Sequence, residues 1–132
     1  EAGLGARIRI AGRIDPEGVG GVLASAEVFL FPSLSESYGM AVAEAIAAGL
    51  PVVMNRTGEM SRIVENGREG FVCPLRNSGL DEKAWEMSLS RIIGDGSLRR
   101  RMASAAVKTA SQFNSWDDSA REFIEAVGAW TR

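Results

Sequence analysis

The sequence has no histidine, a single cysteine at position 73 and no Asp-x-Asp pair. Imidazoles, thiolates and paired carboxylates are the side chains that most often hold a metal ion in proteins. Their scarcity argues against a metal centre, so we expect neither a metal nor another cofactor. One cysteine cannot form an internal disulfide, which favours a cytoplasmic setting.

Long apolar runs and a strong charge of either sign are also missing. No run of about 18 apolar residues and no signal-peptide pattern occurs, so we expect no membrane-spanning segment. The 15 basic and 17 acidic side chains leave a net charge of −2. Nucleic-acid-binding proteins carry a basic surface, so we expect no nucleic-acid partner. We interpret the basic run 99–101 as a solvated face, with docking at the inner face of the membrane as the alternative.

What is present is an ordinary globular composition, with 132 residues, 45% of them hydrophobic and 24% charged. This length suffices for one domain with a sizeable core. The chain opens with Glu1 rather than Met and has the strand pattern by Arg7, so we interpret it as part of a longer protein.

Apolar strand patterns alternate with helical patterns in the first half of the chain. We expect strands at residues 7–12, 27–32 (fully buried), 51–54 and 70–73, and short helices at 16–26, 37–48 and 57–65. Residues 81–94, 97–112 and 116–130 have helical periodicity, with Ser97 as a cap. The order predicts an α/β fold, a Rossmann-like parallel sheet of about four strands with helices on both faces and a C-terminal helical tail. We treat residues 1–132 as one partial domain, with an α/β core at 1–75 and a helical part at 76–132.

The segment 29–54 contains the most informative pattern, a strand, a polar turn, a helix and a second strand. From Met40 to Ala48, Glu44 is the only residue that is not apolar. Burying an unpartnered polar group costs several kcal/mol, on the order of 2–7. We therefore expect Glu44 to bind hydroxyl or N–H donors of a ligand, or else to pair with a core arginine.

The turn at residues 35–39 lies where ligands bind in open α/β sheets, between the carboxyl end of a strand and a helix start. We expect Ser37 to cap this helix and Gly49 to end it. Free N–H groups of Tyr38, Gly39 and Met40 would then form a phosphate site. With Glu36 and Glu44 facing the same crevice, hydroxyl-bearing groups fit on either side of that phosphate. A sugar nucleotide has this layout. The structural alternatives are a dipole interaction for Glu36 and a core position for Tyr38.

The residues Pro32-Ser33, Glu36-Ser-Tyr-Gly39, Glu44-Ala and Gly49-Leu-Pro51-Val-Val closely resemble the signature of family 4 retaining glycosyltransferases of the GT-B fold. The signature's core is two glutamates separated by seven residues, here Glu36 and Glu44. Further matches run along nearly the whole chain, at 8–12, 27–32, Thr57-Gly58, 66–72 and Phe113 with Trp116.

This resemblance implies a role for each residue of the motif. Glu36 would contact the donor sugar and lie nearest the chemistry, as the catalytic residue. Glu44 would bind the two ribose hydroxyls, and the N–H groups from Ser37 to Met40 would hold the diphosphate. Arg13 and Ile14 would lie against the nucleobase. The family transfers a sugar from a nucleotide donor to an acceptor with retention at the anomeric carbon, and GT-B enzymes work without a metal.

The chain departs from the family pattern in two ways. Glu59 stands where a second glycine is usual, and Arg62 stands where a glutamate is common. The chain also lacks the first two strands of the nucleotide-binding domain, the basic pair that neutralises the diphosphate, and the whole acceptor domain. We therefore expect residues 7–12 either to pair beside 27–32 or to leave an edge through which the chain dimerises.

These features favour the donor-binding part of a glycosyltransferase that would be inactive as this piece alone. Its partners would be a nucleotide-sugar donor, an acceptor glycan, lipid or small molecule, and the missing acceptor domain. Two alternatives stay open at this point. One is a non-catalytic sugar-nucleotide-binding or interaction module, and the other is a GT-B-like sugar-nucleotide epimerase.

Overall fold

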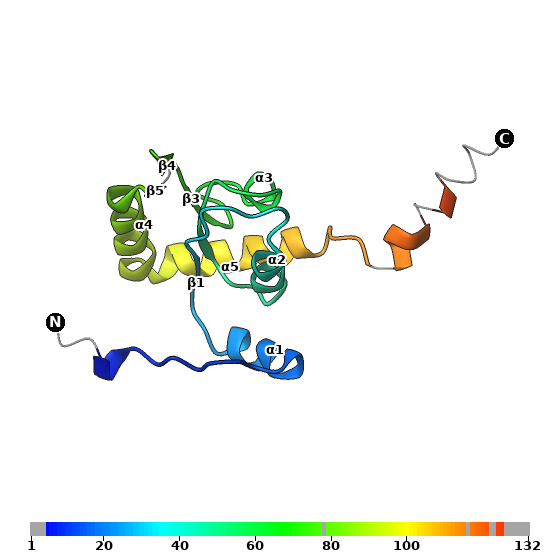
Figure 1. Ribbon diagram of the computed structural model, residues 1–132, viewed down its shortest axis with the longest axis horizontal. Coiled ribbons are helices and arrows are strands. Elements are labelled where there is room, and N and C mark those ends of the chain that lie inside the picture. Colours follow the sequence, from blue (N-terminus) through cyan, green and yellow to red (C-terminus); the bar gives the residue numbers. More distant parts are fainter. Residues whose placement is uncertain (1–4, 78, 116, 122–123, 126–132) are drawn as a thin grey trace.

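A three-stranded parallel sheet forms the centre of the computed structural model, which describes residues 5–77, 79–115, 117–121 and 124–125 (Figure 1). Its strands are β1 (Phe29–Phe31), β2 (Val52–Asn55) and β3 (Gly70–Cys73), in the order β1-β2-β3. Each strand is parallel to its neighbour. The predicted α/β class is therefore confirmed.

The helices α1 to α5 follow the predicted alternation, and a 3-10 turn that was not predicted precedes them. They are η1 (Gly5–Arg7, a 3-10 turn), α1 (Pro16–Ala24), α2 (Met40–Ala47), α3 (Met60–Ile63), α4 (Glu82–Gly94) and α5 (Gly96–Ala110). A small antiparallel hairpin, β4 (Leu75–Arg76) and β5 (Gly79–Leu80), precedes α4 and was not predicted, because two-residue strands show no periodicity. Residues 117–121 and 124–125 are helical. The other positions of the predicted helix 116–130 lie outside the described residues.

Both faces of the sheet are covered by helices, as predicted. All four residues of β2 are buried, because successive side chains point to opposite faces. Val52 and Met54 pack with α2, whereas Val53 packs with α4 and the start of α5. Two apolar clusters, one on each face, therefore fix β2 as the centre of the core.

The predicted strand at 7–12 is wrong. Residues 8–12 are irregular, and the side chains of Ile8 and Ile10 are 63% and 91% exposed. The segment runs beside α1, away from the sheet (Figure 1). An alternating pattern gives a strand only where a neighbour accepts its hydrogen bonds. Neither the fourth strand of the sheet nor the pairing beside 27–32 forms.

The second predicted strand is shorter and more exposed than expected. β1 spans only Phe29–Phe31, and Leu30 is exposed rather than fully buried. Among the described residues β1 hydrogen-bonds to β2 alone, so within that part of the chain it is an edge strand. Its apolar sequence was typical of a central strand, and the missing neighbour is what exposes it.

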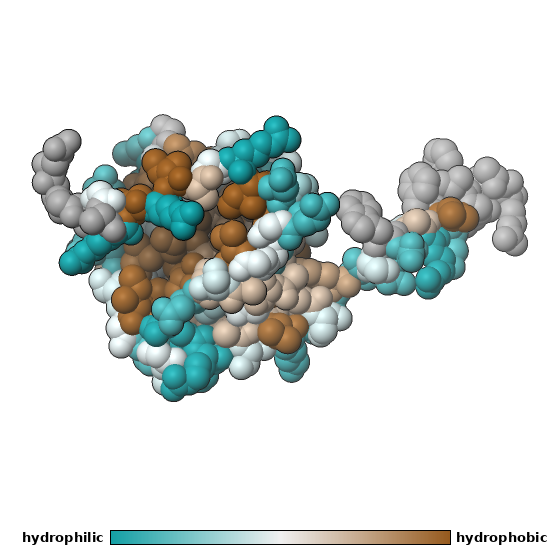
Figure 2. Space-filling view, turned by 90° about the horizontal axis from the view of Figure 1, so that it is seen from below, coloured by the Kyte–Doolittle hydropathy of each residue, from teal (hydrophilic) through white to brown (hydrophobic). Residues whose placement is uncertain are grey.

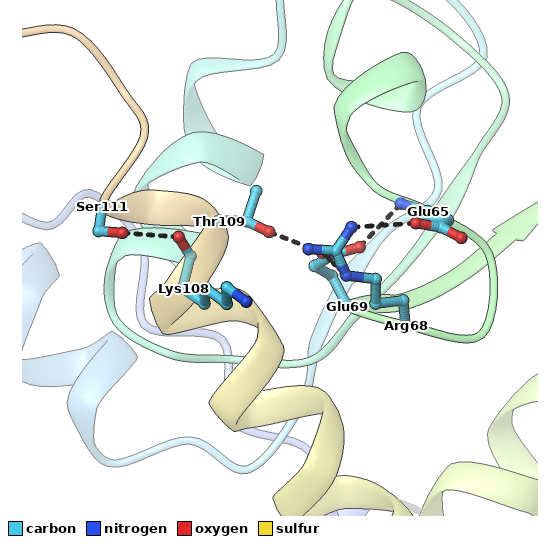
Figure 3. Close-up of polar contacts among 6 residues, drawn as sticks. All are labelled: Glu65, Arg68, Glu69, Lys108, Thr109 and Ser111. Carbon is cyan, nitrogen blue, oxygen red and sulfur yellow. Dashed lines mark hydrogen bonds and ion pairs between the residues drawn. The ribbon is translucent and has the colours of Figure 1, made fainter.

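A buried carboxylate fastens α5 to the turn before β3 (Figure 3). The side chain of Glu69 is fully buried, and Thr109 Oγ1 donates to its Oε1 at 2.6 Å. Arg68 Nε lies 3.1 Å from the same oxygen, and the Glu65 N–H donates to Oε2 at 2.9 Å. A buried charge needs such partners, so this network holds the end of α5 against the sheet.

Candidate functional site

The loop between β1 and α2 carries the residues that the sequence singled out. Ser33 Oγ donates to the carbonyl of Ser35 at 2.8 Å, and the Ser37 N–H donates to Glu36 Oε1 at 3.1 Å. Glu36 is half-buried, and no basic side chain of the described residues pairs with it. Its second carboxylate oxygen therefore stays available to a ligand.

The far end of this loop packs against the segment that leads into α3. The N–H groups of Glu59 and Met60 donate to the carbonyls of Ser37 and Tyr38, at 3.0 and 3.1 Å. Gly58 lies so close that a Cβ there would be 3.1 Å from the carbonyl oxygens of both Glu36 and Ser37. The backbone around Glu36 is thus fixed by a neighbouring loop rather than by its own turn alone.

The α2 helix does not begin as predicted. The N-cap is Gly39, with φ +96°, and no side chain caps the helix, so the prediction of Ser37 as the cap is wrong. Ser37 instead uses its N–H to hold Glu36. Among the described residues, none accepts a hydrogen bond from the N–H of Tyr38, Gly39 or Met40. Unpaired N–H groups at a helix start are suited to bind an anion.

The C-terminus of the same helix is as predicted. The N–H of Gly49 donates to Ile46 and that of Leu50 to Ala45, the pair of bonds that ends a helix at a glycine. This end turns the chain directly into β2.

Glu44 is exposed, which corrects the expectation of a desolvated carboxylate. Val42, Ala45 and Ile46 supply the buried face of α2, and Glu44 points away from it. Glu44 has no partner among the described residues, so its pairing with a core arginine is also wrong. What indicates a ligand at Glu44 is therefore the position of its side chain beside a cavity, and not the free-energy cost of burying its carboxylate.

A cavity of about 590 Å³ lies between α1 and α2 beside Glu44. Its walls are mostly apolar and include Ile14, Pro16, Val19 and Leu23. The structure thus brings Ile14 and Glu44 to one cavity from positions 30 residues apart. Arg13 and Glu36 are not among the lining residues.

Tyr38 and Met40 line a second hollow, of about 680 Å³, together with Ala43 and Phe113. Tyr38 is 44% exposed, so the prediction of a core position for it is wrong. Glu36 is not among the residues that line this hollow. Its lining includes both apolar and polar side chains.

The two departures from the family pattern interact with each other. Arg62 Nη1 lies 3.2 Å from Glu59 Oε2, one helical turn apart and exposed. Arg62 and Arg56 line a polar hollow of about 420 Å³ at the carboxyl end of β2. The charge introduced at one position thus partly neutralises the charge at the other.

Sequence reasoning missed Asn55, and it matched Thr57 to the family pattern without giving it a role. Asn55 is fully buried at the end of β2, and its side chain joins the Ser33 carbonyl to the Trp85 indole. Thr57 Oγ1 is buried without a hydrogen-bond partner among the described residues. The only sequence signal for Asn55 was weak: a side-chain amide that ends an apolar strand at the carboxyl edge of the sheet.

No three metal-binding side chains cluster within the part of the chain that the structure describes. In that same part, every helix is too short or too polar to cross a bilayer.

Comparison with known proteins identifies the class. The chain superimposes on sucrose-phosphate synthase from Thermosynechococcus elongatus with a TM-score of 0.83 and 23% identity, over 97% of this chain and 31% of that one. It superimposes on Anabaena HepE in complex with UDP and glucose with a TM-score of 0.77 and 26% identity, over 96% of this chain and 33% of that one. The fold and the strand–loop–helix site therefore place the chain among GT-B glycosyltransferase domains.

Sequence comparison then gives the family. The model for glycosyl transferases group 1 matches residues 1–109, and the chain belongs to this family. It is 31% identical to the D-inositol 3-phosphate glycosyltransferase of Corynebacterium urealyticum and 34% identical to that of Corynebacterium diphtheriae, over 95% of this chain in both cases. The chain spans only 28% of the length of either relative.

Proposed function

We propose that this chain is the donor-binding part of a glycosyltransferase that moves a sugar from a nucleotide-sugar to an acceptor with retention of anomeric configuration. The observation that carries the proposal is the α2 unit. Among the described residues, Glu36 has no basic partner and the N–H groups of three residues at the helix start have no acceptor, and Glu44 borders a cavity. Family membership and the UDP and glucose bound by HepE support the same donor class.

The subsites follow from this geometry. The apolar cavity between α1 and α2 takes the nucleoside, with its base near Ile14 and its ribose hydroxyls on the exposed carboxylate of Glu44. The N–H groups of Tyr38, Gly39 and Met40 take the diphosphate, together with Ser37 if its bond to Glu36 opens. Glu36 takes hydroxyls of the sugar. A carboxylate binds such hydroxyls through charge-assisted hydrogen bonds.

In the reaction, the bond between the anomeric carbon and the terminal phosphate oxygen breaks, and the diphosphate leaves with the electron pair. The acceptor hydroxyl forms the new bond to that carbon and passes its proton to the oxygen of the leaving diphosphate. Negative charge grows on the leaving diphosphate, so N–H groups already aimed at it stabilise the transition state without a metal. The acceptor and the remaining diphosphate contacts come from the rest of the whole protein.

The test is ligand protection of the full-length protein. UDP, GDP and ADP are each added at millimolar concentration and the melting temperature is recorded. We expect one of them to raise it, and we expect Glu44→Ala to weaken that nucleotide about tenfold or more, because a hydrogen bond to a charged group contributes about 1.5–3 kcal/mol.

Glu86→Ala is the matched control, because Glu86 is also an exposed helix glutamate but lies on α4. It should leave nucleotide protection unchanged. Glu36→Ala should retain protection by the nucleotide and lose sugar transfer, which separates an enzyme from a binding module. A wild-type protein that none of the three nucleotides protects contradicts the proposal.

A further inference from the structure

Asn55 links three elements of the fold at the carboxyl end of the central strand. Its Nδ2 donates to the carbonyl of Ser33 at 2.9 Å, and its Oδ1 accepts from Trp85 Nε1 at 2.8 Å. Asn55 ends β2, Trp85 lies in α4, and Ser33 begins the loop to α2. One side chain thus ties the Glu36 loop to the rigid core.

Packing alone does not explain an asparagine here. The side chain is fully buried, where an amide without partners costs free energy and an aliphatic side chain does not. Its hydrogen bonds repay that cost only because both partners are in place. Ser33 lies in irregular backbone after β1, where no strand among the described residues pairs with it. The Asn55 side-chain amide is therefore the only hydrogen-bond donor to the Ser33 carbonyl among the described residues.

The Asn55 bond holds the first part of the Glu36 loop, and the N–H groups of Glu59 and Met60 hold its last part. In the sequence, Glu36 lies between these two attachments, and the unpaired N–H groups of residues 38–40 lie at or directly after the second one. Their directions depend on both attachments, since the loop has no other long-range hydrogen bond among the described residues.

We propose that Asn55, supported by Trp85, is a positioning residue that fixes the loop of Glu36 for the sugar and diphosphate part of the donor. This inference rests on the proposed function for its ligand. It separates the site into a nucleoside part on α1 and α2, which does not depend on Asn55, and a loop part, which does.

Two variants of the full-length protein separate the two bonds. Asn55→Asp keeps the shape and the bond from Trp85 but cannot donate to the Ser33 carbonyl. Trp85→Phe removes only the indole donor. Thr109→Val is the matched control, because it also removes a buried hydrogen bond, to Glu69 (Figure 3), and neither of these residues belongs to the Glu36 loop.

The ligand probes are UMP and UDP-glucose. If GDP or ADP protects the wild type instead of UDP, the corresponding guanosine or adenosine nucleotides replace them. We expect Asn55→Asp to weaken UDP-glucose about tenfold and UMP less than about twofold, and Trp85→Phe to weaken UDP-glucose about threefold, the size of one hydrogen bond or less. Thr109→Val should change neither affinity. Equal weakening of UDP-glucose by Asn55→Asp and Thr109→Val, or none by Asn55→Asp, overturns the inference.

Hydrogen exchange without ligand gives an independent readout. Asn55→Asp should speed exchange of the amides at residues 34–38 and leave those in the last turn of α5 at their wild-type rates. Thr109→Val should speed exchange in the last turn of α5 and leave residues 34–38 unchanged. Unchanged exchange at 34–38 in Asn55→Asp overturns the inference. A wild type that binds no nucleotide contradicts the proposed function, and this exchange experiment still decides the role of Asn55.

Discussion

At the scale of single residues, two glycines allow the Glu36 loop and the neighbouring loop to approach each other. Gly39 has φ +96° and Gly58 has φ +64°, a left-handed conformation that costs other residues about 1–2 kcal/mol. A Cβ at Gly39 would lie 3.2 Å from Met60 Cγ. At Gly58 the neighbours are backbone carbonyls, which cannot rotate away as a side chain can.

Gly58→Ala should therefore displace the loop of Glu36. We expect the melting temperature to fall, since the left-handed strain alone costs about 1–2 kcal/mol. We also expect weaker binding of UDP-glucose or the corresponding donor, measured by titration calorimetry.

Gly67→Ala is the control for strain without contact. Gly67 also has a positive φ, +91°, but nothing lies within 4 Å of a Cβ built there. This variant should lose stability and keep its donor affinity. Equal losses of donor affinity in the two variants would show that Gly58 acts through stability alone.

The individual site residues show what sequence reasoning can and cannot reach. The apolar and polar pattern of residues 29–54 predicted one strand–loop–helix unit, and the structure builds that unit. The burial of Glu44 was predicted wrongly because the small apolar residues around it do not all face the core; Ala47 and Ala48 are exposed. The link from Asn55 to Trp85 spans 30 residues of sequence, and no local pattern reports such a contact.

At the scale of elements, Asp95 joins α4 to α5 and caps the second of them. Its Oδ1 accepts from the N–H groups of Ser97 and Leu98, both at 2.9 Å, so the predicted cap Ser97 is wrong. The Leu98 and Ser97 N–H bonds, with Arg101 and Arg100 nearby, lower the pKa of the Asp95 carboxyl below its ordinary value of 3.8. The charged form therefore stabilises the start of α5.

The pH dependence follows from the lowered pKa. A carboxyl with a lower pKa in the folded state adds stability above its ordinary pKa of 3.8, and loses it as the pH falls through the folded value. Asp95→Asn keeps the acceptor oxygen but not the charge. We expect wild type to melt above Asp95→Asn at pH 7 and the difference to shrink below pH 3.8, measured by circular dichroism.

Asp95→Ala removes both the acceptor and the charge, so it should melt below Asp95→Asn at pH 7. A gap between wild type and Asp95→Asn that grows as the solution is acidified would contradict this assignment of the cap.

The predicted elements formed where the segment has a partner among the described residues, and the predicted strand that has none did not form. β2 and β3 pair with each other, and α4 and α5 bury apolar faces on them, so their patterns sufficed. Residues 7–12 have an equally clear alternation, but no strand in the part of the chain that the structure describes pairs with them. Periodicity reports which face of an element is apolar, but not whether another element covers that face.

At the scale of the whole molecule, the free side of β1 is an apolar edge. Leu30 is 47% exposed, and Ile8, Ile10 and Ile14 are exposed on the segment that runs below the sheet. Apolar side chains gather on this lower face among hydrophilic ones (Figure 2). Unpaired strand edges next to apolar surface are sites of association between chains.

The chain of residues 1–132 alone should therefore self-associate through β1. We expect its apparent mass in size-exclusion chromatography with light scattering to rise with concentration, and Leu30→Lys to return it toward the monomer. A lysine on an edge strand opposes pairing with a second chain, because two such charges would lie close together in the paired sheet.

Ile93→Lys, at an exposed apolar position on α4, is the control and should leave the association unchanged. A concentration-independent monomer mass for the unmodified chain would show that this edge is closed in solution, and equal effects of the two lysines would assign the association to general hydrophobicity instead of β1.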